Sequence, residues 1–466
     1  MAAVRYRLDS SWRRPGDGQV LVAGSPLRLF RLSTGGAQVT AMLEHGEAPD
    51  TAAIHQLFDR FVAAGALHPV YSAGPFTAAD VTVVVPAYGD VPEQLVQQLV
   101  EQLSAPGAAR LGAVIVVDDA SPTPISFHVM VPPCFSLLRH ETNQGPGAAR
   151  NTGLAEVASP LVAFVDTDVV LSPGWLEPLL AHFADPLVAL VAPRVVGLPG
   201  DGRVAEYEER HSPLDLGPEP ARVAAGTRVS YVPAAALVCR VEVMREVGGF
   251  VDSLRFGEDV DLVWRLADGG HRCRYEPESV VHHRARPTLL AMLRQRFGYG
   301  RSAAPLAARH PGALAPVRMS GWSAATWLLL AMRRPLLAGG VAVGTTAALV
   351  RKLHDLPPSE SARLAGLGHI AAGRQFASAV TRVWWPVALP AAMLLRRARL
   401  PVLAALIGPA LYDAARSHST RPLTDAPLAT LDQMAYGAGV WAGVLAERNA
   451  GPLTPEFTNW PPRGGG

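Results

Sequence analysis

The sequence predicts an α/β fold, with a central domain built on a parallel sheet, a small module before it and apolar helices after it. Three observations predict this arrangement. Continuous β-branched runs alternate with helical stretches between about Asp80 and Arg286, which favours parallel strands joined by right-handed crossovers. A short segment with strands and helices of its own precedes them. After about Ser302 the chain turns into apolar stretches flanked by arginine. We expect domains at residues 1–75, 80–302 and 303–450, and a flexible tail at 451–466.

The overall composition favours a folded protein and argues against several functional classes. Of the 466 residues, 49% are hydrophobic and 18% are charged, so a large core is possible. The net charge of +2 provides no basic field of the kind that attracts nucleic acid. Cys134, Cys239 and Cys273 are widely separated, which argues against a disulfide scaffold or a structural zinc site. The first residues contain no apolar run, so no signal peptide is expected.

The first module is predicted to contain short strands and two helices. Residues 21–33 alternate as strands do, and residues 35–46 and 49–64 have helical patterns. Leu57, Phe61 and Val62 fall on one face of the second helix, which Gly65 would end. The chain then becomes extended to Val70, and residues 72–80 form a linker.

In the central domain, residues 81–88, 113–121 and 161–171 are continuous apolar runs, as expected of strands buried on both faces. Helical stretches at 93–103 and 145–157 separate them. This alternation is the basis for the predicted parallel sheet.

The region after Ser302 contains five apolar stretches, none of which by itself reaches the ~20 residues of a straight membrane span. Between Ala303 and Ala446 there are 14 basic and 5 acidic side chains. Short apolar helices edged with arginine are typical of a membrane surface or of shallow insertion. The alternative is a soluble, alanine-rich bundle with a solvated basic face, which the pattern alone does not distinguish.

Four aspartates are expected at one edge of the sheet. Asp118 and Asp119 close the second predicted strand, and Asp166 and Asp168 close the third. Parallel strands place their carboxyl ends at the same edge, where ligands of α/β folds bind. Carboxylates gathered there repel one another unless a cation compensates, and Mg²⁺ or Mn²⁺ prefers oxygen ligands. A single aspartate would more simply cap a helix, but two successive pairs favour a metal site.

Two further motifs carry charged residues at predicted helix starts. The Gly-Pro-Gly stretch after Asn143 precedes a helix that contains Arg150, which suits an anion at the helix N-terminus, although such a start is often only a turn. Glu258, Asp259 and Asp261 begin another helix. Their placement is explained by the helix dipole or, alternatively, by a general base near an acceptor hydroxyl.

Three residues near these motifs are candidate ligands. Arg265 follows the acidic cluster and could meet a diphosphate or a carboxylate. His282 and His283 end an extended segment, where neighbouring side chains point in opposite directions, so only one of them can face the site. An imidazole there could complete a metal shell, although an isolated histidine is more often a surface residue.

Taken together, these motifs resemble the family 2 glycosyltransferases of GT-A fold. The motifs VVVPAY, VVDDAS, NQG…AARNTG, DTD and GEDVDLVWRL occur in the order seen in that family. The resemblance covers the central domain. It implies a sugar-nucleotide donor, Mg²⁺ or Mn²⁺, and inversion at the anomeric carbon. The Gln-x-x-Arg-Trp motif of the processive members is absent, and RQRFGYG is only a loose echo of it, which argues against synthesis of long polymers.

The resemblance also implies roles for the candidate residues. Asp259 would be the catalytic base with Glu258 beside it, and Asp168 with Asp166 would hold the metal and diphosphate. The other implied roles are a nucleotide pocket bordered by Pro86 and Tyr88, a uracil contact at Asp118 or Asp119, a further metal ligand at His283 or His282, and diphosphate contacts at Arg150 and Arg265.

The whole chain resembles the glycosyltransferases of mycofactocin biosynthesis. The segments LFRLSTGG, HQLFDRFVAAG and ALHPV make the first module similar to the PqqD-like winged-helix fold, which binds leader peptides. This resemblance implies transfer of glucose from UDP-glucose onto a peptide-derived redox cofactor or its precursor, building a short β-linked glucan at the cytoplasmic face of the membrane.

Three alternatives remain open from the residues alone. A metal-dependent nucleotidyltransferase would carry a basic Gly-rich loop after the first strand, where this chain has the acidic PAYGDVPEQL. A peptide-binding scaffold with an inactive transferase domain would not need every acidic motif. A transferase acting on a cell-envelope polysaccharide or lipid would show the same catalytic motifs.

Overall fold

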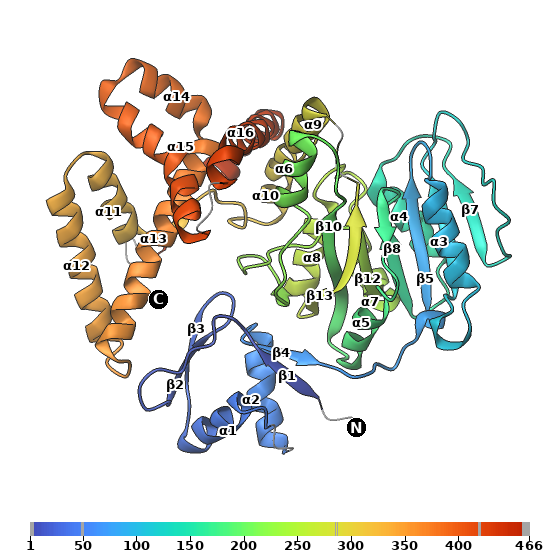
Figure 1. Ribbon diagram of the computed structural model, residues 1–466, viewed down its shortest axis with the longest axis horizontal. Helices are drawn as coiled ribbons and strands as arrows, with labels where there is room; N and C mark the ends of the chain where they lie inside the picture. Colours follow the sequence, from blue (N-terminus) through green and yellow to red (C-terminus); the bar gives the residue numbers. More distant parts are fainter. Residues whose placement is uncertain (1–3, 48–50, 285, 287, 418–420, 459–466) are drawn as a thin grey trace. The chain divides into compact units, whose positions relative to one another are not determined.

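A mixed sheet forms the centre of the fold. Its strands are β5 (Val81–Ala87), β6 (Ala113–Asp118), β7 (Phe135–Arg139), β8 (Leu161–Val165), β9 (Val169–Leu171), β10 (Val188–Gly197), β11 (Ala221–Val223), β12 (Ala236–Arg240) and β13 (Arg272–His283). In this computed structural model, which describes residues 4–47, 51–284, 286, 288–417 and 421–458, the nine strands follow the order β11-β13-β10-β12-β8-β5-β6-β7, with β9 paired to β13 (Figure 1).

The predicted parallel sheet is in fact mixed, because β9, β11 and β12 run antiparallel to the strands beside them. β5 is parallel to both β6 and β8, as expected, but β12 is antiparallel to its neighbours β8 and β10. β10 and β13 are parallel to each other and therefore run in the same direction as β8. The apolar pattern did not show this reversal, because a strand buried between two others is apolar whatever its direction.

The third predicted strand, residues 161–171, is divided into two. β8 ends at Val165, and β9 begins at Val169 and pairs antiparallel with the end of β13. Asp166, Thr167 and Asp168 connect them. This break matters for the site, because the register places Val169 opposite His283.

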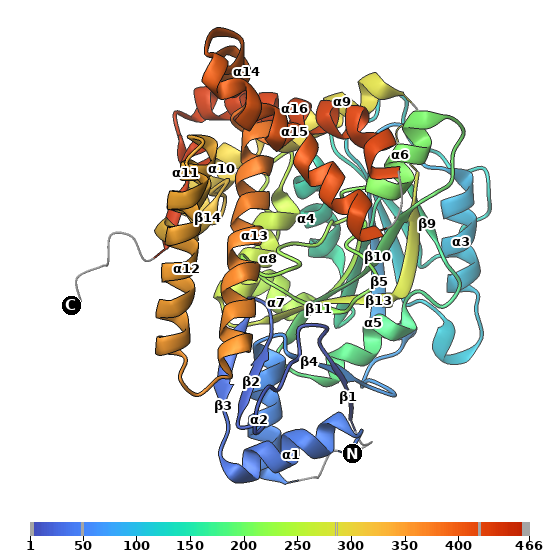
Figure 2. The same cartoon turned by 60° about the vertical axis from the view of Figure 1, so that its left-hand side comes forward.

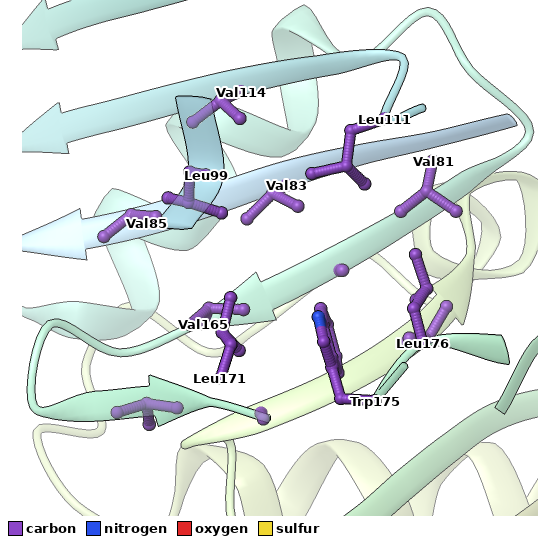
Figure 3. Packing of buried hydrophobic residues seen from close by; sticks show 14 of the residues in the cluster. Val81, Val83, Val85, Leu99, Leu111, Val114, Val165, Leu171, Trp175 and Leu176 are labelled. Atoms are coloured by element: carbon purple, nitrogen blue, oxygen red, sulfur yellow. The ribbon is translucent and has the colours of Figure 1, made fainter. Parts of the chain in front are cut away.

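Helices cover the sheet and complete its core. The central strands are entirely buried, and α3 (Glu93–Leu103) packs Leu95, Leu99 and Leu103 into the same apolar cluster. In Figure 3 Val81, Val83 and Val85 of β5 share one face of that strand and lie among Leu99, Leu111, Val114 and Trp175. α4 (Pro146–Glu156) packs on β5, and α8 (Glu258–Asp268) packs near β13. α5 (Glu177–Ala181), α6 (Arg203–His211) and α7 (Val241–Glu246) are shorter.

The N-terminal segment has its own small core. It contains β1 (Arg5–Leu8), β2 (Val20–Ala23), β3 (Arg28–Arg31), α1 (Thr34–Glu44), α2 (Ala52–Ala63) and β4 (Leu67–Val70). The two helices confirm the predicted ones. Phe61 and Val62 are buried as expected, and Phe58 joins them. β1 pairs with β4, and β2 pairs with β3.

Polar contacts join this segment to the sheet domain. Arg272 of β13 bonds Asp59 of α2 at 2.5 Å and Asp185 at 2.7 Å. Ser25 accepts a hydrogen bond from the backbone N–H of Arg228 at 2.5 Å. Both parts belong to one compact unit, Met1–Ala285, and Arg286–Gly466 forms a second unit.

The second unit consists mainly of helices, as the sequence predicts. They are α9 (Leu289–Arg301), α10 (Ala303–Arg309), α11 (Gly321–Ala331), α12 (Pro335–Lys352), α13 (Pro358–Arg382), α14 (Trp385–Leu394), α15 (Arg396–Ser417) and α16 (Arg421–Glu447). α12 and α13 lie side by side (Figure 2). The predicted central domain, residues 80–302, includes α9. The boundary between the two units lies before α9, at Arg286, so this helix belongs to the second unit.

Two expectations for the second unit need correction. The helices extend beyond the apolar stretches, and one of them, Arg396–Ala415 of α15, is long and apolar enough to cross a membrane by length and composition. The chain there continues helically through Pro401 and Pro409. The predicted flexible tail is ordered at Glu456–Thr458, where β15 pairs with β14 (Arg318–Ser320). Residues 459–466 of that tail lie outside the described residues.

Candidate active site

The carboxyl edge of the sheet gathers the predicted acidic residues. Asp118 ends β6, and Asp166 and Asp168 follow β8, which runs parallel to β5 and β6 through the shared pairing with β5. His283 ends β13 at the same edge. The topology therefore places these four side chains at one rim, as the sequence predicts.

Asp118 and Asp119 are held by the protein itself. Asp118 is fully buried and accepts from the backbone N–H of Ser121 at 2.8 Å and from Arg139. Burial alone raises its pKa, but these hydrogen bonds outweigh that effect and lower it. Asp119 accepts from the backbone N–H groups of Gln144 at 2.8 Å and Gly145 at 2.7 Å. Asp119 thus fixes the loop before α4, whereas Asp118 holds the turn after β6 and the end of β7.

Arg150 joins two carboxylates from different elements. From the buried face of α4 its Nη1 donates to Oε1 of Glu258 at 2.8 Å, and its Nη2 donates to Oδ1 of Asp166 at 2.6 Å. Its guanidinium also lies 5.3 Å from the centre of the Phe250 ring. The nitrogen Nε has no hydrogen-bond partner among the described residues. Arg150 is therefore a fixed positive charge beneath the acidic rim.

Glu258 and Asp259 begin α8 directly after Gly257, whose left-handed φ of 79° a glycine adopts without strain. Burial, with Asp259 beside it, raises the pKa of Glu258 to about 7, although the contact with Arg150 opposes the shift. Burial also raises the pKa of Asp259, whose carboxylate accepts from the backbone N–H groups of Val260 at 2.8 Å and Ala234 at 3.2 Å. A carboxylate with a raised pKa is a stronger base.

Asp168 and His283 form the other half of the rim. Oδ2 of Asp168 lies 3.1 Å from Nε2 of His283, because the pairing of β9 with β13 brings the two together. The Asp168 side chain is 28% exposed and that of His283 is 11% exposed, so both can be reached by a ligand. The Nδ1 atom of His282 is buried without a partner among the described residues.

These side chains suit a divalent cation that shares its ligands with a substrate. One carboxylate oxygen and one imidazole nitrogen meet at the sheet edge, and Mg²⁺ or Mn²⁺ takes such ligands together with phosphate oxygens. Among the residues that the structure describes, no three or more His, Cys, Asp or Glu side chains are grouped so as to hold a metal ion by themselves.

The remaining predicted residues lie apart from the Arg150 cluster. Arg265 donates to Asp261 at 2.7 Å and to the carbonyls of Val247 and Gly249, so its nitrogens are engaged in holding α8. Pro86 is buried within β5, whereas Tyr88 is 61% exposed just beyond it.

Sequence reasoning missed the residues that orient the rim. His140 follows β7 and bonds Asp119 at 2.8 Å through Nδ1 and Thr152 at 2.8 Å through Nε2. Arg139 ends the same strand. The sequence contained one signal for these residues. β7 is a further strand parallel to β6, so the residues at its carboxyl end must lie at the same edge of the sheet as the aspartates.

Comparisons with known proteins show the family of this chain. The family model "Glycosyl transferase family 2" matches residues 82–247. Proteins named "Pre-mycofactocin glycosyltransferase" from two strains of Mycobacterium tuberculosis are 41% identical to this chain, over 97% of this chain and 97% of theirs. The chain belongs to the pre-mycofactocin glycosyltransferase family. As a member of this family it is a glycosyltransferase, and its mixed sheet is of the GT-A type.

Other proteins are similar to this family member at lower identity. Glycosyltransferase AglE of Haloferax volcanii is 27% identical over 35% of this chain and 52% of its own length. Among solved structures, a mannosyltransferase of Pyrobaculum calidifontis in complex with GDP-Man and Mn²⁺ is 18% identical, with a TM-score of 0.43 over 81% of this chain and 91% of its own.

Proposed function

We propose that this protein transfers glucose from UDP-glucose, with inversion, onto the peptide-derived precursor of a mycofactocin-type redox cofactor, building a short β-linked glucan. The observation that carries the proposal is the whole-length similarity to the mycobacterial pre-mycofactocin glycosyltransferases, at 41% identity. The site supports the same chemistry, because an acidic base and a candidate metal pair occupy one edge of the sheet.

In this proposal Asp259 is the base that removes the proton from the acceptor hydroxyl. Burial raises its pKa, which makes the carboxylate a stronger base. Glu258 lies beside it and is held by Arg150. The acceptor oxygen attacks the anomeric carbon as the bond to the diphosphate breaks on the opposite side, so the nucleoside diphosphate leaves and no covalent enzyme intermediate forms.

Asp168 and His283 would hold the Mg²⁺ or Mn²⁺ ion, with Asp166 close by. When bound, the ion would neutralise charge on the leaving diphosphate. Arg150 adds a fixed positive charge at the same rim, although its two terminal nitrogens already bond Asp166 and Glu258. We assign Arg150 mainly to positioning these carboxylates.

The proposal also assigns roles to the two regions that flank the sheet domain, namely the N-terminal segment and the second unit. We assign the N-terminal segment to a PqqD-like winged-helix module that takes a leader peptide or the peptide-derived acceptor. The second unit would rest on the cytoplasmic face of the membrane, peripherally or shallowly inserted. Leu336, Val343 and Leu394 there are 90%, 70% and 83% exposed, and arginines flank these helices, as expected at an anionic lipid surface.

The test is product analysis with the purified full-length protein. UDP-glucose and GDP-mannose are each offered with Mn²⁺ and the candidate precursor, and mass spectrometry follows the acceptor. We expect additions of one hexose mass from UDP-glucose only. Transfer solely from GDP-mannose would overturn the donor assignment, and release of pyrophosphate from nucleoside triphosphates would indicate a nucleotidyltransferase. Sedimentation with anionic vesicles tests the membrane assignment, which is wrong if the protein stays in the supernatant.

A further inference from the structure

A cavity lies within the first unit, where the N-terminal segment meets the sheet. It measures about 410 Å³ including the open solvent at its mouth. β4 supplies His68 to its lining, and β13 supplies Arg274 and Glu276. His182, Arg7, Tyr275 and Glu278 contribute the other polar side chains of the wall.

Arg274 is a buried cation without a hydrogen-bond partner. It is 3% exposed, and its Nε and Nη1 atoms make no hydrogen bond with any described residue. Burial, together with Arg272 and Arg222, lowers its pKa to about 10, so it remains charged at neutral pH. Buried donors almost always have partners, and an unpaired buried charge is costly, so this arrangement calls for an anion.

Two of the neighbouring charged groups already have partners. Arg272, two residues earlier and on the same face of β13, is paired with Asp59 and Asp185. Nε2 of His182 lies 2.8 Å from Glu276. The Nδ1 atom of His182 is, after Nε and Nη1 of Arg274, the third buried atom in the lining without a partner among the described residues. The cavity therefore contains a buried guanidinium and an imidazole nitrogen without hydrogen-bond partners among the described residues, with the carboxylate of Glu278 also in its wall.

We propose that this cavity is a second ligand site, which binds a carboxylate through the guanidinium of Arg274 with His182 beside it. Arginine is the side chain best suited to carboxylates, because its planar fork of donors matches them. Arg274 lies near the start of β13 and His283 at its end, roughly 20–30 Å away, so the site is separate from the rim where transfer takes place. The carboxylate can belong to a small dicarboxylic acid or to an acidic peptide.

Binding of glutarate to the full-length protein tests the proposal by calorimetry, with glutaramide as the uncharged control. We expect glutarate alone to bind, and Arg274→Met to weaken binding at least ten-fold. Acetyl-Ala-Glu-Ala-amide distinguishes the two sources, because binding at least ten-fold tighter than glutarate assigns the site to a peptide. Comparable or weaker binding assigns it to a small acid. No binding of either probe, unchanged affinity in Arg274→Met, or binding of phosphate but not carboxylates would overturn the proposal.

Thermal unfolding distinguishes loss of the ligand site from poor folding of the Arg274→Met variant. An arginine kept for a ligand contributes nothing to the ligand-free protein, so Arg274→Met should be at least as stable as the wild type. Arg272→Met is the matched control and should melt lower, because it breaks two ion pairs. A lower melting temperature for Arg274→Met, equal to that of the control, would show a structural role instead. UDP binding should be unchanged in Arg274→Met.

Discussion

Nη1 of Arg150 donates to Oε1 of Glu258 at 2.8 Å, although the two residues are 108 positions apart in the sequence. α4 supplies the arginine and α8 supplies the glutamate, and the same guanidinium reaches Asp166. This one side chain therefore ties the candidate base region to the candidate metal edge. The pKa of Glu258, about 7, places its titration in the pH range where the enzyme would work.

Activity should rise with pH through about 7. The folded-state pKa of Glu258 is raised from 4.5 to about 7, so below that pH the carboxyl keeps a proton, and the raised pKa of Asp259 acts in the same direction. Glu258→Gln removes the titration of Glu258 but keeps a side-chain oxygen that can accept the hydrogen bond from Arg150. We expect its pH–rate profile to move to lower pH, because Asp259 no longer faces a second negative charge. A profile identical to the wild type would exclude Glu258 from the titrating group.

Asp259→Asn should abolish transfer and leave donor binding nearly intact. The amide cannot take up the proton of the acceptor hydroxyl, and loss of a general base typically costs about 10²–10⁴-fold in rate. Initial rates of UDP release with acceptor, and calorimetry with UDP-glucose, measure the two effects. The matched control is Asp268→Asn, an exposed aspartate at the far end of α8, which should retain full activity. Wild-type turnover in Asp259→Asn would refute the assignment.

Asp168→Ala should lose the metal-dependent part of nucleotide-sugar binding. The side chain lies 3.1 Å from His283, and together they form the candidate metal pair. Titration of UDP-glucose in the presence and absence of Mn²⁺ gives the measurement. Asp201→Ala, an exposed aspartate elsewhere in the same unit, serves as the control. If Mn²⁺ strengthens binding equally in both variants, Asp168 is not a ligand.

Gly153→Ala should destabilise the sheet domain by about 1–3 kcal/mol through overpacking. A Cβ atom at Gly153 would lie 2.4 Å from Cγ1 of Val84, which is fully buried in β5. Gly35 in α1 provides the opposite case, because nothing lies within 4 Å of its Cβ position. Gly35→Ala should be neutral or slightly stabilising. Urea unfolding compares the two, and equal stability of both variants would contradict the close packing of α4 on β5.

The N-terminal segment should lose stability as the pH falls. Burial raises the pKa of Asp9, but bonds from His68 at 3.0 Å and from Ser11 lower it from 3.8 to about 2. Burial lowers the pKa of His68 from 6.5. Both depressed values mean that the unfolded chain binds more protons, so stability is full above pH 6.5 and declines below it.

The Asp9 share of this loss falls between about pH 4 and 2 and amounts to roughly 2 kcal/mol. Hydrogen exchange of the N-terminal segment at decreasing pH measures it. Asp9→Asn should remove most of the acid dependence in that range, whereas Asp17→Asn, an exposed aspartate of the same segment, should leave it unchanged. An acid response that persists in Asp9→Asn would assign the loss to other groups.

The sequence by itself determined the strands β5, β6 and β8, the helices between them and the edge at which the acidic residues gather. The short β-branched runs of the central domain indicated buried strands, and aspartates at the ends of parallel strands must meet at one rim. It therefore placed Asp118, Asp166 and Asp168 at that edge, where the structure has them. The expected family is the one that the whole-length similarity to the pre-mycofactocin glycosyltransferases shows.

The tertiary structure alone decided which of these side chains touch. Nothing local indicates that β12 reverses direction, or that β8 ends at Val165 so that β9 can pair with β13. These pairings set Asp168 beside His283. The same packing directs the guanidinium of Arg150 to Asp166 and Glu258, whereas the sequence suggested that Arg150 binds an anionic ligand. Contacts between distant segments depend on strand register and helix packing, which the periodicity of a single segment does not encode.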